Sequence, residues 1–231
     1  MNDKNEDLLD QLLQMSGNGI DANSDIFKEE DLALFPLCEE IAEIEDQSIR
    51  LFVRAVLLAV DDHFWSGPSS TSGKYHPPDE SGEGGLILHT KRVVRAADFL
   101  CSSQERTSLE RDMIIAACIL HDITKNVKWQ DGTLHYDSMH PYSASTFIRD
   151  LRLADEENES RVGSTTIYID DLILYQIIKM IRCHLGPWSP VPETMPTVTS
   201  EWIVHLADNM ATQLHIIVDG ENVRPERWTV T

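Results

Sequence analysis

Six histidine and aspartate residues, spread over five segments of the chain, have side chains that commonly bind divalent metal ions. Two of them are adjacent: His121 and Asp122 end the apolar run in ACILHDITKN, residues 117–126. Burying the Asp122 carboxylate unpaired would cost several kcal/mol or more. No Lys or Arg lies within the preceding turn, and Lys125 is the nearest one after it. We therefore expect this helix end to face a cation. The other four candidates are His89, His140, His184 and Asp208.

The number of these positions is what favours a metal site. A single histidine on an apolar helix face is more often a satisfied core residue than a ligand. Here the candidates occupy five positions, each on a separate predicted helix, which favours a shared ion. Imidazole and carboxylate ligands suit Zn, Mn, Fe, Co or Ni, and the carboxylates favour Mn or Mg over softer metals. The pattern predicts a site for one or two divalent ions between helices.

The elements that must position these residues are predicted to be helices, so the fold is predicted to be mostly α. Apolar residues recur at three- and four-residue steps along most of the chain. Ser108 is the expected N-cap of the helix that ends at Asp122. Residues 128–138 and the acidic stretch 153–166 are expected to be loops. We expect one or two helices over 32–64, and further helices over 86–101, 108–122, 141–151, 170–184 and 199–218.

Length and composition fit one globular domain with short extensions. The chain has 231 residues, of which 42% are hydrophobic. We expect a peripheral segment over residues 1–30, a helical domain over 31–220 and a tail over 221–231. No apolar stretch reaches the ~18 residues that a membrane helix needs, and the acidic N-terminus lacks the form of a signal peptide. We therefore expect a cytoplasmic protein.

The charge of the chain limits its binding partners. Lys and Arg together number 19 and Asp and Glu 39, which gives a net charge of −20. Such a field repels polyanions and disfavours extended nucleic acid as a partner. A small anion could still bind through a local metal or basic pocket. Apolar residues within the first 30 positions could serve a homodimer contact.

The order His, His-Asp, His, His, Asp resembles the HD-domain superfamily of metal-dependent phosphohydrolases. The resemblance rests on five pieces in order: GGLILHTKRVV, AACILHDITK, HPYSASTFI, IIKMIRCHLGPW and WIVHLADNM. It implies a helical bundle with a metal site between helices. Two departures bear on the number of ions. Thr124 stands where HDIGK-type members have glycine, and Cys183-His184 stands where the richest two-metal branches have a His-His pair.

Carried over to this chain, the resemblance assigns ligands to two ions. His89, His121, Asp122 and Asp208 resemble the ligands of the first ion. His140 and His184 match the added histidines of the two-metal branches, in which Asp122 would bridge both ions. Because of the Cys183 departure, a complete second site is less firmly implied than the first.

Five residues are candidates for contact with substrate or for catalysis. Asp122 and Lys125 are the catalytic candidates, and Lys125 is the first choice for a phosphate contact, with a solvated helix-end lysine as the alternative. Lys74 and His76 lie in SGKYHPPDESGEGGL, which is similar to the segment before the first histidine in exoribonuclease-like HD proteins. They could close over a substrate, or this loop could simply be exposed. Trp188 could stack on a base or pack in the core.

These observations support hydrolysis of a small phosphorylated substrate, preferably a nucleotide, by metal-activated water. One alternative is a nuclease or phosphodiesterase that acts on nucleic acid ends, which the loop resemblance favours. Another is a non-catalytic HD regulatory module. A third, a mixed-valent di-iron oxygenase, needs a similar ligand set. Metal analysis and a substrate panel would separate these readings.

Overall fold

The computed structural model describes residues 34, 36–70, 76–125, 127–130, 133–157, 169–213, 217–218 and 221–222. All elements below belong to the compact unit that begins at Pro36. The expected peripheral segment, residues 1–30, lies outside the described residues, as does most of the expected tail. The domain boundaries therefore stay predictions.

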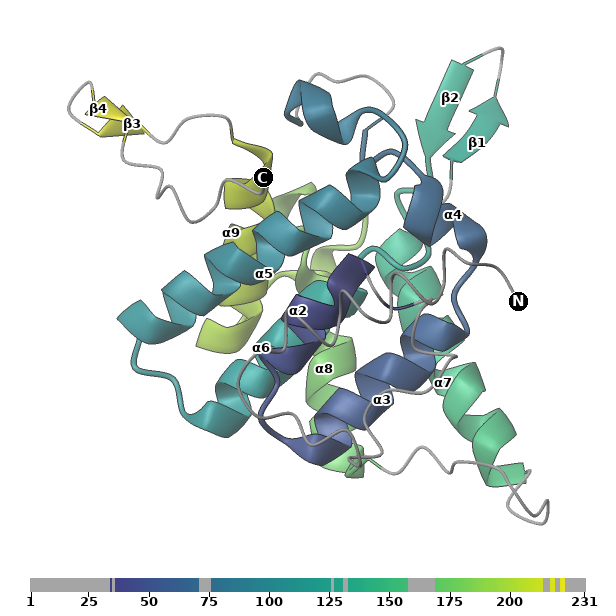
Figure 1. Ribbon diagram of the computed structural model, residues 1–231, viewed down its shortest axis with the longest axis vertical. Helices are drawn as coiled ribbons and strands as arrows, with labels where there is room; N and C mark the ends of the chain where they lie inside the picture. Colours follow the sequence, from purple (N-terminus) through teal and green to yellow (C-terminus); the bar gives the residue numbers. More distant parts are fainter. Residues whose placement is uncertain are drawn as a thin grey trace, which may run out of the picture. The chain divides into compact units, whose positions relative to one another are not determined.

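The described part of the chain is mostly helical, as predicted (Figure 1). Between α4 and α5 lies the short 3-10 helix Pro78–Glu80, and the 3-10 helices Gly186–Trp188 and Pro192–Thr194 join α8 to α9. Within the described ranges, no helix combines the length and apolar character needed to cross a bilayer. The α-helices are α2 (Cys38–Ala42), α3 (Gln47–Leu58), α4 (Asp62–Ser66), α5 (Gly85–Ser103), α6 (Ser108–Leu120), α7 (His140–Glu157), α8 (Asp171–Cys183) and α9 (Thr199–Thr212).

Helix α6 forms the centre of the domain. Every residue from Ile114 to Leu120 is fully buried, so this part of the helix is apolar on all sides. A helix of that kind must be surrounded by other elements. It packs against α3, α5, α8 and α9, and α5 in turn lies along α9 (Figure 1). The end of α6 thus lies inside the bundle, where His121 and Asp122 follow it.

Several helix ends differ from the expectation, and α7 continues to Glu157, into the stretch that was expected to be a loop. The N-cap of α6 is Thr107 rather than Ser108, and Thr107 forms a capping box with Glu110. A capping box satisfies two backbone N–H groups and needs Glu or Gln three residues after the N-cap. Thr107 has Glu110 at that spacing, whereas Ser108 has neither Glu nor Gln there. The last helix ends at Thr212 rather than at residue 218, because Gln213 already has extended backbone angles. Beyond it, β3 (Ile217–Val218) pairs with β4 (Glu221–Asn222).

The expected loop over residues 128–138 is instead largely a β-hairpin. Strand β1 (Val127–Gln130) pairs antiparallel with β2 (Thr133–Tyr136), with Gln130 opposite Thr133. The sequence between them, Asp131-Gly132, is typical of a two-residue hairpin turn. The hairpin connects the end of α6 to the start of α7, so both ends of this connection lie near candidate site residues.

The start of α5 is held tightly against the 3-10 helix before it. Gly84 has a positive φ of 72°, a conformation that glycine adopts without strain. A Cβ atom at Gly85 would lie 2.0 Å from the backbone oxygen of Glu80. The two glycines of the GGL motif therefore allow the chain around Glu80 to approach the first turns of α5.

Candidate metal centre and active site

The structure brings all six candidate ligands together at the core of the bundle. His121 and His184 are the C-caps of α6 and α8, and His140 is the first residue of α7. His89 lies in the second turn of α5, and Asp208 lies within α9. Five are buried, and the Asp208 side chain is 19% exposed. Residues far apart in sequence thus converge because each helix ends at, or passes, the same point.

The first group of ligands consists of His89, His121 and Asp208. One ligand atom of each lies within 4.8 Å of the others. The Nε2 atom of His89 is 3.0 Å from Asp208 Oδ1, and the Nε2 atom of His121 is 3.9 Å from the same oxygen. Asp122 Oδ2 is 3.3 Å from His121 Nε2 and so also faces this group.

The second group consists of Asp122, His140 and His184. Asp122 Oδ1 is 3.0 Å from His140 Nε2 and 3.7 Å from His184 Nε2. The two Nε2 atoms are themselves 3.0 Å apart. The two oxygens of Asp122 therefore face different groups, which is the arrangement that a bridging carboxylate requires.

The tautomers of three histidines are set by backbone carbonyls. In His121, His140 and His184 the Nδ1 atom lies 2.7 Å from the carbonyl oxygen three residues earlier. A neutral imidazole that donates from Nδ1 carries its lone pair on Nε2. Three lone pairs therefore point into one buried space, where they repel one another unless a cation or a proton lies between them.

The donor set fits a divalent cation. The Nε2 atom of His121 and the Oδ1 atom of Asp122 are buried and have no hydrogen-bonding partner in the described part of the chain. Unpaired buried polar atoms are costly, and an ion would pair both. Imidazole nitrogen and carboxylate oxygen suit Mn, Fe, Co, Ni and Zn. The geometry offers ligands for one ion in each group, and the donor types do not select a single metal.

Asp122 has a cationic partner in the chain itself. The Nζ atom of Lys125 lies 2.7 Å from Asp122 Oδ2, so this lysine is one cation that the end of α6 faces. Burial would raise the pKa of Asp122, but the surrounding imidazoles and Lys125 hold it well below its usual range. Burial would lower the pKa of Lys125, yet the Asp122 and Asp208 carboxylates raise it above its ordinary value. Lys125 therefore remains charged at the edge of the centre.

The two groups differ in the protonation of their histidines. Burial would lower the pKa of His89, but the carboxylates of Asp208 and Glu80 raise it to about 9. In contrast, burial and the neighbouring His121 and His140 rings lower the pKa of His184 to about 3. Without an ion, a proton therefore occupies His89 at neutral pH, while His184 is neutral.

The remaining sequence candidates have different surroundings. His76 lies beside the first group, with its ring centroid 4.9 Å from that of His89. Lys74 lies outside the described residues. The side chain of Trp188 is 66% exposed, so the alternative that it packs in the core is wrong. Outside these candidates, His205 is buried, and its Nδ1 atom lies 2.8 Å from the carbonyl oxygen of His184.

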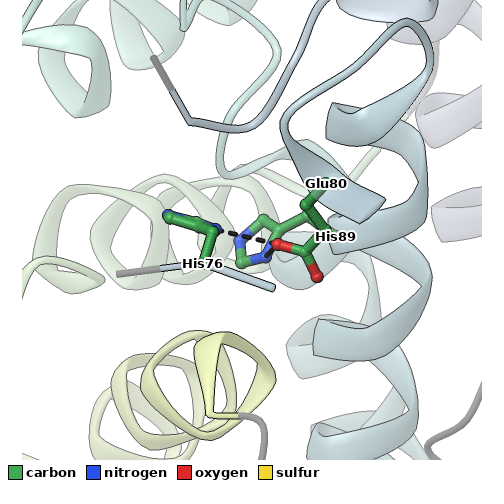
Figure 2. A group of neighbouring side chains, drawn as sticks. All are labelled: His76, Glu80 and His89. Carbon is green, nitrogen blue, oxygen red and sulfur yellow. Dashed lines mark hydrogen bonds and ion pairs between the residues drawn. The ribbon is translucent and has the colours of Figure 1, made fainter. Parts of the chain in front are cut away.

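Glu80 is a buried residue of the site that the sequence did not single out. Figure 2 shows His76 and His89 converging on its carboxylate. Its side chain has no exposed surface, and Arg92, one turn after His89 on α5, binds it. Glu80 lies in PPDESGEGG, among other acidic residues of a predicted loop. The sequence does not distinguish Glu80 from the other two acidic residues of this loop. The available signal for a buried acid was Arg92, a basic residue three positions after the candidate ligand His89.

Comparison with known proteins adds two findings. A family model described as the HD domain matches residues 86–213, which is more than half of the chain. The chain is also 32% identical over 140 residues to the dihydroneopterin 2′,3′-cyclic phosphate phosphodiesterase of Methanocaldococcus jannaschii. The match covers 58% of this chain and 48% of that relative, so the chain spans about half of its length. No solved structure matches the chain significantly.

Proposed function

Because this chain belongs to the HD domain family, we propose that it is a metal-dependent phosphohydrolase that cleaves a phosphoester in a small molecule. The observation that carries the proposal is the convergence of three Nε2 lone pairs and two carboxylates in one buried space. The Nε2 atoms of His140 and His184 lie 3.0 Å apart, close enough for one bound ion to contact both.

The ligands divide between two positions. His89, His121 and Asp208 would hold the first ion, His140 and His184 the second, and Asp122 would bridge them. Such ions, when bound, lower the pKa of a coordinated water towards neutrality and offset the charge that develops on phosphoryl oxygens. Candidate metals are Mn, Fe, Zn, Co, Ni and Mg.

Lys125 is the proposed phosphate contact. Its ammonium group is held beside Asp122 Oδ2 and stays protonated, so it can pair with a phosphoryl oxygen as negative charge accumulates there. Asp122 orients this lysine and the two ligand groups at once. We therefore assign catalytic roles to Asp122 and Lys125.

The substrate is proposed to be small. The net charge of −20 disfavours a long polyanion, and the relative described above is named for a 2′,3′-cyclic phosphate. A cyclic phosphodiester or a nucleotide is the preferred class. The indole of Trp188 is exposed enough to stack on an aromatic ring of the substrate. His76 is proposed to contact the substrate from the loop, and Lys74 stays a prediction.

A substrate panel tests the proposal. The metal-stripped protein is reloaded with each candidate metal and assayed on bis-p-nitrophenyl phosphate, 2′,3′-cyclic nucleotides, 5′-mononucleotides and a short oligonucleotide. We expect hydrolysis of a small phosphodiester with at least one metal. Lys125→Gln should lower turnover by about 100-fold while keeping bound metal, as expected when one charge-stabilising donor is removed. Metal binding without hydrolysis of any substrate would support the regulatory alternative and overturn the proposal.

A further inference from the structure

The carboxylate of Glu80 is buried beneath the metal centre and contacts several groups at once. Its Oε2 atom lies 2.8 Å from His76 Nδ1, accepts a hydrogen bond from Ser69 Oγ at 3.1 Å, and lies 3.3 Å from His89 Nδ1. Its Oε1 atom accepts a hydrogen bond from Arg92 Nη1. Burial would raise the pKa of Glu80, but these donors hold it well below its usual range. A charged carboxylate is thus fixed on the side of His89 that faces away from Asp208.

We propose that Glu80 is a positioning residue for the first metal ion, which holds the Nδ1 side of His89 so that Nε2 is directed at the ion. This inference rests on the proposed metal centre. A neutral imidazole that binds an ion through Nε2 must keep its proton on Nδ1. The Nδ1 atom of His89 is buried and makes no hydrogen bond within the described residues, and the carboxylate oxygen Oε2 of Glu80 lies 3.3 Å from it.

His89 differs in this respect from the other three histidines of the centre. His121, His140 and His184 each face a backbone carbonyl of their own segment with Nδ1. For His89, the carbonyl oxygen three residues earlier, that of Leu86, accepts a hydrogen bond from Thr90 Oγ1 instead. A carboxylate acceptor makes an imidazole a more basic ligand than a neutral carbonyl does. Glu80 should therefore raise the affinity of the protein for the first ion and leave the affinity for the second ion unchanged.

The same cluster could be taken for a third metal position, because ligand atoms of His76, Glu80 and His89 lie within 4.8 Å of one another (Figure 2). Two observations speak against a third ion. His89 Nε2 already faces Asp208 at 3.0 Å, and a neutral imidazole has a single lone pair. The guanidinium of Arg92 also contacts Glu80 and would repel a cation there. The geometry fits a carboxylate that supports His89 better than a further ion.

Outer contacts hold Glu80 in place. Arg92 also forms a two-pronged ion pair with Asp79, with distances of 3.0 and 2.6 Å. The backbone carbonyl of Glu80 accepts a hydrogen bond from the backbone N–H of Ser69 at 2.9 Å. The Asp79 side chain is 55% exposed, so it can be changed with little effect on the core. A chain of contacts thus runs from the surface through Arg92 and Glu80 to His89.

Metal titration of the metal-free protein tests the inference directly. Glu80→Gln keeps the size of the side chain but removes its charge. We expect the affinity of the first ion for Mn, measured by calorimetry and by electron paramagnetic resonance, to fall by about 10- to 100-fold. The second ion should bind as in the wild type. Asp79→Asn, which loosens only Arg92, should give a smaller fall in the same direction.

The matched control is Glu40→Gln. Glu40 is another buried glutamate with a basic partner, but it lies on α2, and its ion pair among the described residues is with Lys91 rather than with a ligand of the centre. This variant should bind both ions with wild-type affinity. Melting of each metal-free variant shows whether it folds, and Asp79→Asn keeps the inference testable if Glu80→Gln does not fold.

Each outcome has a distinct meaning. Unchanged Mn affinity in a folded Glu80→Gln variant, or equal weakening of both ions, would overturn the positioning role. Binding of three ions by the wild type, with one lost in Glu80→Gln and the first unaffected, would overturn it in favour of a third ion. If the wild type binds Mn but hydrolyses no substrate, the proposed function fails while the effect of Glu80 on metal affinity is still measured.

Discussion

The half of the centre formed by His89, His121 and Asp208 differs from the half formed by Asp122, His140 and His184 in what surrounds its imidazoles. In the first half, Asp208 lies beside two histidines and the Glu80 carboxylate lies behind one of them. In the second, both histidines are backed by neutral carbonyls, and Asp122 is the acidic ligand.

This difference has a consequence for ion binding. Each additional carboxylate near an ion favours its binding electrostatically, and burial strengthens that effect. We therefore expect the first half to bind its ion more tightly than the second, with Asp122 serving both. This order of affinities agrees with the sequence. Cys183 stands where the richest two-metal branches have a histidine, so a complete second site is less firmly implied than the first.

Removing the shared ligand should have the largest effect. Asp122→Ala deletes the oxygens that face both halves, so we expect loss of both ions and a fall in hydrolysis of about 10³-fold or more. Metal content by elemental analysis and turnover with added Mn measure the two losses. Asp171→Ala, which changes an exposed aspartate at the start of α8, is the control and should keep both. Retention of one tightly bound ion by Asp122→Ala would break the idea of a bridging carboxylate.

His184→Ala should separate the two halves. The Nε2 atom of His184 faces Asp122 Oδ1 and His140 Nε2, so the variant should lose the second ion and keep the first. Stoichiometry in a Mn titration should fall from two ions to one, and turnover should fall with it. His63→Ala, on α4, replaces a histidine outside the centre and should keep the wild-type stoichiometry. Equal loss of both ions from His184→Ala would contradict the division of ligands.

The halves should also respond differently to pH. The pKa of His89 is raised to about 9 in the metal-free protein, so below that pH an ion must displace a proton. The affinity of the first ion should fall about tenfold for each pH unit below 9, or about 100-fold between about pH 8.5 and about pH 6.5. The pKa of His184 is lowered to about 3, so this residue imposes no such penalty on the second ion.

Calorimetry in buffers of different ionisation enthalpy measures this proton release. One proton should be released when the first ion binds at about pH 7, and its release should vanish above about pH 9. If the affinity of the first ion does not vary over this pH range, the ion does not displace a proton from His89.

The convergence of the candidate ligands could be anticipated from the sequence, whereas the residues that contact them from behind could not. The ligands are chemically unusual for their positions, since imidazoles and carboxylates that end apolar helices such as α6 stand out against the core around them. Glu80 does not stand out, because a glutamate in an acidic loop is ordinary until Arg92 and His89 lie beside it. Its role depends on contacts between two elements, which periodicity and spacing within one segment do not report.

The strands that the sequence analysis missed were missed because they are short. The helices were predicted because apolar periodicity accumulates over many residues, but the four-residue strands β1 and β2 are too short for such a signal. Their turn sequence, Asp131-Gly132, nevertheless indicates a hairpin, and the sequence TSLE indicates the capping box that starts α6 at Thr107.

Replacing His205, which supports the second half of the centre, should have the smallest effect that still distinguishes the two ions. Its Nδ1 lies 2.8 Å from the carbonyl oxygen of His184, and its ring fills the space beside Gly186, where a Cβ would lie 2.5 Å from it. His205→Ala should let the end of α8 shift and weaken the second ion by about tenfold or less, while the first ion binds as before. Mn titration measures both affinities, and melting of the metal-free variant measures the packing loss separately. A larger effect on the first ion would show that His205 acts through Asp208 on its own helix rather than through His184.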